Sequence, residues 1–148
     1  LLERREAIGG TWDLFRYPGI RSDSDMHTLG YDFKPWEAEK TIADGPSILS
    51  YVNETADEYR IRDHIRFRQK LVAADWCSQR SQWQLTVETP EGIRRYRCGF
   101  LMMCAGYYSY EQGYEPEFEG KSDFRGDWIH PQFWPDSLAY EDKKVVVS

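Results

Sequence analysis

Apolar and polar positions follow two different periods along the middle of the chain. Across residues 45–59 the apolar positions recur at helical spacing and a proline stands in the first turn, which predicts an amphipathic helix. Apolar and polar residues alternate over 65–73 and again over 83–88, which predicts two strands. A turn then leads into a third strand, and we expect its apolar end at 100–105 to be buried. The pattern therefore predicts a helix followed by a three-stranded meander.

The segments around these elements show little periodicity. Residues 9–36 are rich in Gly, Pro, Asp and aromatic residues, and ordered loops of this length are usually functional. Residues 107–142 have a similar composition and form a connector. Leu1–Glu3 and 143–147 are short apolar stretches typical of the end and the beginning of a buried strand. We therefore expect the chain to be an internal piece of a larger protein.

Composition narrows the class of protein. The 148 residues, 41% of them hydrophobic and 30% charged, suit one ordinary globular domain. A net charge of −6 argues against a nucleic-acid partner, because such domains carry a basic face. The basic residues Arg94, Arg95 and Arg97 are interpreted as a solvated strand face. No apolar run is long enough for a transmembrane segment.

The cysteines and histidines predict no metal site. Cys77, Cys98 and Cys104 are odd in number and lack Cys-x-x-Cys spacing, so neither a disulfide framework nor a zinc knuckle is indicated. His27 and His64 stand far apart without metal-ligand spacing. Free thiols suit a reducing compartment, and we expect a cytoplasmic protein.

The first stretch whose residues could bind a ligand or take part in a reaction lies near the beginning of the chain. Glu3 closes an apolar stretch, where an acidic residue of a dinucleotide-binding unit accepts hydrogen bonds from ribose hydroxyls. The pair Gly9–Gly10 allows a planar ring system to approach the backbone, and Trp12 offers a stacking face. Arg21 and Asp23 offer a charge pair. The plainer alternatives are a surface carboxylate at Glu3 and a structural salt bridge in the loop.

The second stretch is a motif with fixed spacing. Phe124, Gly126, His130, Trp134 and Pro135 fit the pattern F-x-G-x-x-x-H-x-x-x-W-P without a gap. This pattern is the fingerprint of Baeyer–Villiger monooxygenases, and we use the word fingerprint for these five residues below. A single histidine beside proline and aromatic residues is otherwise more often a packed or solvated imidazole than an acid–base group.

The whole chain resembles flavin-dependent Baeyer–Villiger monooxygenases, in particular the ethionamide-activating type found in mycobacteria. The string GGTWDLFRYPGIRSDSDM, which begins at Gly9, carries this likeness together with TLGYDFKPW, RFRQKLVAADW and CAGYYSYEQGY. The resemblance implies an α/β fold: the FAD-binding part of a Rossmann-like flavoprotein with two dinucleotide-binding domains, truncated at both ends, with a β-meander. It divides the chain into a partial FAD-binding domain with the meander at 1–106, a linker with the fingerprint at 107–142, and the first strand of the NADPH-binding domain at 143–148.

The same resemblance implies roles for individual residues. Glu3 would bind the adenosine ribose of FAD, and Leu71 would contact the adenine side through its backbone. The FAD would be lined by Gly9, Gly10, Thr11, Trp12, Asp13 and Leu14, and the flavin and nicotinamide would be faced by Arg21, Ser22 and Asp23. Asp23 would also support a catalytic arginine outside this chain. His130 would couple domain movement to catalysis.

The implied reaction uses a small-molecule substrate and O₂. NADPH would reduce FAD, and a flavin C4a-peroxide would insert one oxygen atom into a ketone or oxidise sulfur or nitrogen. Neither phosphate-binding loop lies in the chain, so we expect it to be inactive by itself. One alternative is a nitrogen- and sulfur-oxidising flavin-containing monooxygenase, which usually has Tyr or Phe in place of Trp134. Another is a non-enzymatic FAD-fold binding module. The substrate and the oligomeric state stay open.

Overall fold

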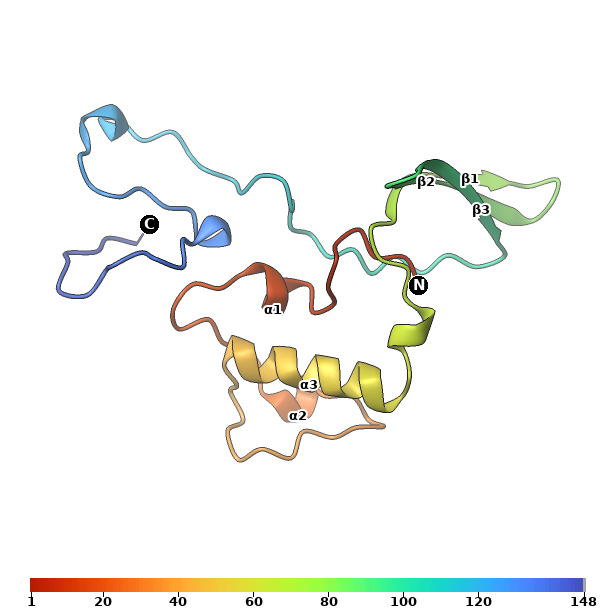
Figure 1. Cartoon of the computed structure of the whole chain (residues 1–148), viewed down its shortest axis with the longest axis horizontal. Helices are drawn as coiled ribbons and strands as arrows, with labels where there is room; N and C mark the ends of the chain where they lie inside the picture. Colours follow the sequence, from red (N-terminus) through yellow and green to blue (C-terminus); the bar gives the residue numbers. More distant parts are fainter. Residues whose placement is uncertain (148) are drawn as a thin grey trace.

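The computed structural model describes residues 1–147, in which a helical part and a β-meander are followed by a long C-terminal segment (Figure 1). The elements are α1 (Thr11–Leu14), α2 (Met26–Leu29), α3 (Gly45–Glu58), β1 (Lys70–Cys77), β2 (Gln82–Thr89) and β3 (Gly92–Cys98), with short 3₁₀ turns η1 (Arg62–His64), η2 (Lys121–Asp123) and η3 (Pro131–Phe133). Within residues 1–147, no helix combines the length and the apolar character that crossing a membrane requires.

Helix α3 confirms the amphipathic helix predicted at 45–59. Asp44 caps its N-terminus, because the carboxylate accepts the backbone N–H of Ser47 at 3.0 Å and the Ser47 hydroxyl at 2.8 Å. These hydrogen bonds, with Lys40 nearby, lower the pKa of Asp44 to about 2. Ile48 and Ala56 are buried on the inner face of the helix. The helix therefore begins at a sequence-encoded cap and is held by its apolar face.

The main core lies between α3 and the loop that contains α2. Its buried members are Met26, Trp36, Ala43, Ile48 and Tyr51. Trp12 of α1 and Val52 of α3 are partly buried and pack against this cluster. The Tyr51 hydroxyl accepts the backbone N–H of Tyr31 at 2.8 Å and donates to the carbonyl of Lys34. The predicted long loop at 9–36 is thus ordered, and two short helices interrupt it.

The three strands form an antiparallel sheet in the order β1-β2-β3, which confirms the predicted meander. Leu85 and Val87 of β2 are buried, as the alternation predicts. The first strand begins at Lys70, whereas the alternating pattern predicted a start at residue 65. Residues 66–69 instead bond to the beginning of the chain, and Arg68 has a φ of 55° that a strand does not allow. The register shifts between Leu71 and Ala73, so that Val72 has no partner in β2.

Three stretches predicted to be strand differ from the structure. Strand β3 ends at Cys98, and Phe100 and Met102, in the stretch expected to be buried, are 77% and 73% exposed. Residues 144–147 form no strand, and Leu1 is exposed rather than buried. A strand needs a neighbour to which its backbone can bond. Within residues 1–147 no strand pairs with 100–105 or 144–147, and the beginning of the chain forms only an isolated parallel bridge, between Leu2 and Arg66. The prediction for residue 148 lies outside the described residues.

Candidate functional site

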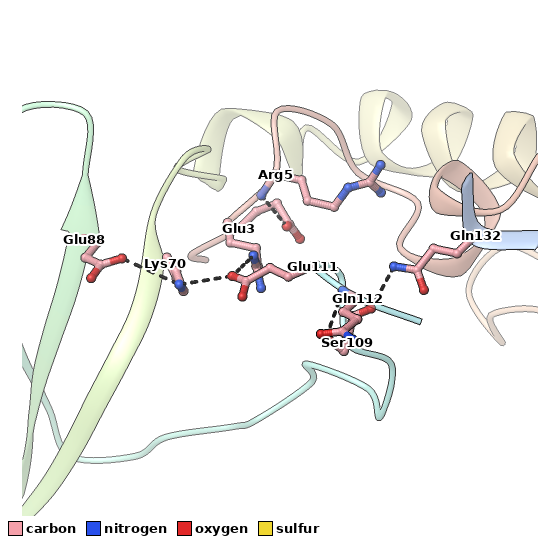
Figure 2. Close-up of polar contacts among 9 residues, drawn as sticks. Glu3, Arg5, Lys70, Glu88, Ser109, Glu111, Gln112 and Gln132 are labelled. Carbon is pink, nitrogen blue, oxygen red and sulfur yellow. Dashed lines mark hydrogen bonds and ion pairs between the residues drawn. The ribbon is translucent and has the colours of Figure 1, made fainter. Parts of the chain in front are cut away.

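Glu3 lies in a backbone layer formed by the beginning of the chain and the residues before β1. Its N–H donates to the carbonyl of Arg66 at 2.9 Å, and its carbonyl accepts the N–H of Gln69 at 2.9 Å. The Glu3 carboxylate accepts the backbone N–H of Arg5 at 2.8 Å through Oε1 (Figure 2). Within residues 1–147, its other oxygen has no hydrogen-bond partner. Leu71 lies just beyond, half-buried at the start of β1. The carboxylate is therefore oriented and keeps one acceptor oxygen available.

The two adjacent glycines serve different purposes. Gly9 has a φ of 113°, and a Cβ atom there would lie 2.4 Å from Cδ1 of Leu49 and 3.2 Å from Cβ of Asp13. Gly10 has a φ of 50°, and a Cβ atom would meet only the Tyr110 hydroxyl, at 3.9 Å. Gly9 thus lets the loop pack on α3. Gly10 is the member of the pair that leaves room for another group to approach the backbone.

The side chains of α1 face inward more than the sequence suggests. Asp13 is 11% exposed, and its carboxylate pairs with Arg5 at 2.7 Å and with Arg16 at 3.2 Å. Arg5 also donates to the carbonyl of Gly10 at 3.3 Å. Trp12 is partly buried and packs against the main core, so part of its indole contacts other side chains of the chain. Thr11 and Leu14 are half-buried. The predicted lining residues are together in space, but several are held by contacts within the protein.

The stretch Arg21 to Asp23 does not contain the structural salt bridge that was the plainer alternative. Within residues 1–147, Arg21 and Asp23 form no ion pair with each other, and both are exposed. Ser22 is buried at 2% exposure, and its hydroxyl accepts the N–H of Ala43 at 3.1 Å. Neighbouring residues in an extended segment point to opposite sides. Ser22 therefore fixes the backbone while its two charged neighbours project outward.

Sequence reasoning missed the segment Tyr107 to Gly113, which we call the strap. Within it, the Tyr108 ring packs edge-on against Phe15 with 5.0 Å between centroids. Hydrogen bonding with Tyr107, followed by partial burial and the negative charge of nearby groups that include Asp23, raises the pKa of Tyr108. The strap therefore lies close to the loop that carries Asp23.

The middle of the strap contacts the loop after Glu3. The guanidinium groups of Arg4 and Arg5 lie 5.5 Å and 5.7 Å from the ring centroid of Tyr110, within cation–π range. Glu111 pairs with Arg4 at 2.9 Å and with Lys70 at 3.3 Å. The only signal in the sequence was the stretch CAGYYSYEQGY as part of the likeness, because side-chain types alone do not show which distant cation an exposed glutamate meets.

The fingerprint histidine also contacts the strap. His130 accepts the backbone N–H of Gln132 through Nδ1 at 3.2 Å, which caps η3. A Cβ atom at Gly113 would lie 2.2 to 2.6 Å from atoms of the imidazole, so the ring lies directly on this glycine. Gln132 is buried and donates to the carbonyl of Ser109 at 2.8 Å (Figure 2). His130 and Gln132 thus dock η3 on the strap.

The remaining fingerprint residues make short-range contacts. The Phe124 ring covers Gly126, where a Cβ atom would come within 2.6 Å of Cζ. Trp134 packs edge-on against Tyr140, with 5.7 Å between ring centroids. Pro135 is exposed, and its carbonyl accepts a backbone N–H three residues further along at 3.1 Å. The F-x-G spacing thus follows from an aromatic ring that folds over a glycine.

Known proteins match this chain in sequence. The family described as FMO-like, flavin-binding monooxygenase-like, matches residues 31–148. The chain is 56% identical over 147 residues to the FAD-containing monooxygenase EthA of Mycolicibacterium smegmatis, covering 99% of this chain and 30% of that protein. It is 47% identical over 148 residues to the probable FAD-binding monooxygenase AlmA of Acinetobacter baylyi, with the same coverage. The chain therefore spans about 30% of the length of these curated relatives.

Solved structures match its fold. An oxidized steroid monooxygenase bound to NADP is 31% identical with a TM-score of 0.73, covering 93% of this chain and 26% of that one. OTEMO in complex with FAD and NADP is 31% identical with a TM-score of 0.69, covering 90% and 25%. The predicted resemblance and the α/β fold with its meander are confirmed by these matches, and these solved neighbours are complexes with NADP, one of them also with FAD. The chain belongs to the flavin-binding monooxygenase-like family.

Proposed function

We propose that the complete protein is a Baeyer–Villiger-type monooxygenase, which uses FAD and NADPH to insert one oxygen atom from O₂ into a ketone or to oxidise sulfur or nitrogen in a small molecule. The main support for the proposal is the fingerprint, which ends in Trp134 and Pro135. Its histidine, His130, packs on the strap at Gly113. The similarity to a steroid monooxygenase and to cyclohexanone monooxygenase supports it.

The residues around Glu3 fit the adenosine end of FAD. The Glu3 carboxylate is already oriented by Arg5 and retains one free acceptor oxygen for a ribose hydroxyl. Gly10 leaves the backbone accessible, and Leu71 would offer its backbone to the adenine. When bound, FAD would carry electrons from NADPH to O₂, which supplies the oxygen atom. The protein residues would bind and orient the cofactor.

The loop from Arg21 to Asp23 would lie at the flavin end of FAD. Arg21 and Asp23 project outward on either side of the buried Ser22, so their charges are available to the cofactors or to residues beyond this chain. A fixed carboxylate beside an arginine places charge where the reaction develops it. We assign this supporting role to Asp23. His130 would couple domain movement to catalysis through its contact with the strap.

The proposal also covers how the chain divides into domains and how the isolated chain would behave. Residues 1–106 would belong to the FAD-binding domain, 107–142 to the linker, and 143–148 to the first strand of the NADPH-binding domain, which forms once neighbouring strands pair with it. Without the two phosphate-binding loops, the isolated chain would be inactive and would release FAD during gel filtration. The free thiols Cys77, Cys98 and Cys104 support a reducing, cytoplasmic setting.

Oxygenation assays on the complete protein test the function. The protein would be supplied with FAD, NADPH, O₂ and either a cyclic ketone or a thioether, with NADPH omitted in the control. We expect a lactone from the ketone. Sulfoxide without any lactone from a panel of ketones would favour the nitrogen- and sulfur-oxidising alternative. FAD binding without any NADPH oxidation would favour a binding module.

A further inference from the structure

Glu111 connects three segments that are far apart in the sequence. Its Oε1 atom lies 2.9 Å from Nη2 of Arg4 and 3.3 Å from Nζ of Lys70 (Figure 2). Arg4 belongs to the loop after Glu3, Lys70 begins β1, and Glu111 belongs to the strap. One carboxylate oxygen thus holds the beginning of the chain, the meander and the strap together.

The cations hold Glu111 in its charged form. The hydrogen bonds from Lys70 and then from Arg4 lower the pKa of this carboxyl below its ordinary value. Lys70 also lies 3.8 Å from Glu88 of β2, which is a longer contact. Arg4, in contrast, pairs with no carboxylate other than Glu111 within residues 1–147. Removing the charge of Glu111 would therefore leave Arg4 without its ionic partner.

Arg4 lies next to the contact that orients Glu3. It stands between Glu3 and Arg5, and the backbone N–H of Arg5 holds the Glu3 carboxylate at 2.8 Å. Arg4 and Arg5 also lie against the Tyr110 ring beside Glu111. A shift of the strap would therefore act on both ends of the short backbone stretch that positions the Glu3 carboxylate.

The strap is also contacted by the 3₁₀ turn η3 and by His130, which caps this turn. Gln132 donates to the carbonyl of Ser109, and the His130 ring lies on Gly113. The strap is thus held by the Glu3 loop in its middle, by His130 of the fingerprint at Gly113, and by Gln132 at Ser109. These contacts form one continuous path from His130 to Glu3.

We propose that Glu111 is a positioning residue that holds the Glu3 loop in the geometry that binds the adenosine end of FAD and links this loop to the fingerprint. The inference rests on the proposed function. Glu111 acts through Arg4 and Lys70 and touches no cofactor atom. It sets how long FAD stays bound and makes that time sensitive to salt.

The test compares Glu111→Gln with Glu88→Gln in the complete protein. Glu88 is the matched control, because it is also an exposed partner of Lys70 but does not contact Arg4. FAD release is followed by the rise of flavin fluorescence at low and high salt. For Glu111→Gln we expect release about threefold faster at low salt, as befits exposed ion pairs, and a loss of the wild-type salt dependence. Glu88→Gln should behave as the wild type.

A double-mutant cycle separates positioning from general stability. Arg4→Met and Glu111→Gln should accelerate FAD release to a similar extent, and the double variant should be no faster than the faster single variant. The melting temperature of the FAD-free protein should not change. Additive effects, or a Glu111→Gln variant that releases FAD like the wild type, would overturn the role of Glu111 and leave the proposed function intact. A wild-type protein that binds no FAD would instead overturn the proposed function and the inference with it.

Discussion

The helical part around α3 and the C-terminal segment with the fingerprint are built in opposite ways. Around α3, large side chains such as Met26 and Ile48 are almost fully buried. In the fingerprint region, Phe124 and Phe133 are more than half exposed, and their aromatic contacts are with near neighbours. Both regions nevertheless have a defined backbone. The first is held by apolar burial, and the second by aromatic rings on glycines and by a few hydrogen bonds.

This difference shows why the more diagnostic motif lies in the less buried region. Core positions accept many apolar residues of similar volume, so they specify the fold loosely. A carbon atom added to a glycine that lies under a ring would force the ring to shift, as the short distances at Gly113 and Gly126 show. Motif positions of this kind are therefore restricted by local geometry, although they contribute little buried area.

The largest loss of stability should follow a core truncation. Ile48 is 4% exposed, and Ile48→Ala should lower the free energy of unfolding of this domain by about 2 to 4 kcal/mol, because it leaves a cavity. Phe133→Ala, at a position that is 55% exposed, should cost less than about 1 kcal/mol. Urea titration of the complete protein measures both. Equal losses would contradict the contrast between the two regions.

Trp12 should show a mixed effect, since it packs on the core and lies at the predicted FAD site. In the complete protein, Trp12→Ala should lower both the melting temperature and FAD retention, with a loss of about 1 to 2 kcal/mol for one aromatic contact. The control is Trp76→Ala on the meander, where the indole is 48% exposed and packs on Trp83. Unchanged flavin occupancy in Trp12→Ala would leave Trp12 with a packing role alone.

The cap of α3 should give a smaller, pH-dependent effect. Asp44→Ala should cost about 1 kcal/mol, the usual value for an N-cap. The pKa of Asp44 lies at about 2 in the folded chain against an ordinary 3.8. Because the folded pKa is the lower one, the stabilisation is complete above the ordinary value and is lost as the pH falls toward 2. Asp44→Asn keeps an acceptor without a charge, so melting curves of this variant should lack that part of the acid dependence.

The smallest change in stability, with a large change in rate, is expected at the fingerprint. His130→Ala in the complete protein should leave the fold and FAD occupancy intact, slow flavin reduction several-fold, and divert NADPH into hydrogen peroxide, because gating steps often limit turnover. Gly113→Ala should act similarly, since its Cβ atom displaces the same imidazole. Stopped-flow reduction, peroxide yield and a melting curve measure these effects. Normal reduction with full coupling, or a lower melting temperature alone, would make His130 a packing residue.

Local sequence patterns correctly predicted those elements whose formation depends on neighbouring residues. The proline in the first turn and the helical spacing after it predicted α3, and the alternation around Leu85 predicted β2. The prediction failed where the outcome depends on a distant partner. Phe100 was expected to lie in a buried strand but has no neighbouring strand within residues 1–147, and the prediction of β1 began too early because residues 66–69 bond to the beginning of the chain.

The candidate site shows the same division. Glu3 and the glycine pair were identified from their order in the chain, and the structure places them together. For Arg21 and Asp23, the plainer alternative of a structural salt bridge between them is not found within residues 1–147, where both residues are exposed on either side of the buried Ser22. The roles of Glu111 and Gly113 depend on contacts with residues far away in sequence, and no spacing rule reveals such contacts.

Because the His130 ring lies directly on Gly113, a substitution at either position alters the same contact. A sequence that keeps the fingerprint but has a bulkier residue in place of Gly113 would carry the motif without the surface on which its histidine rests. Motif searches that require both positions would be more selective than the fingerprint alone. In protein engineering, chimeras of related monooxygenases should take Gly113 and His130 from the same parent. A crossover between them would place the imidazole of one parent against the backbone of the other, where the two need not fit.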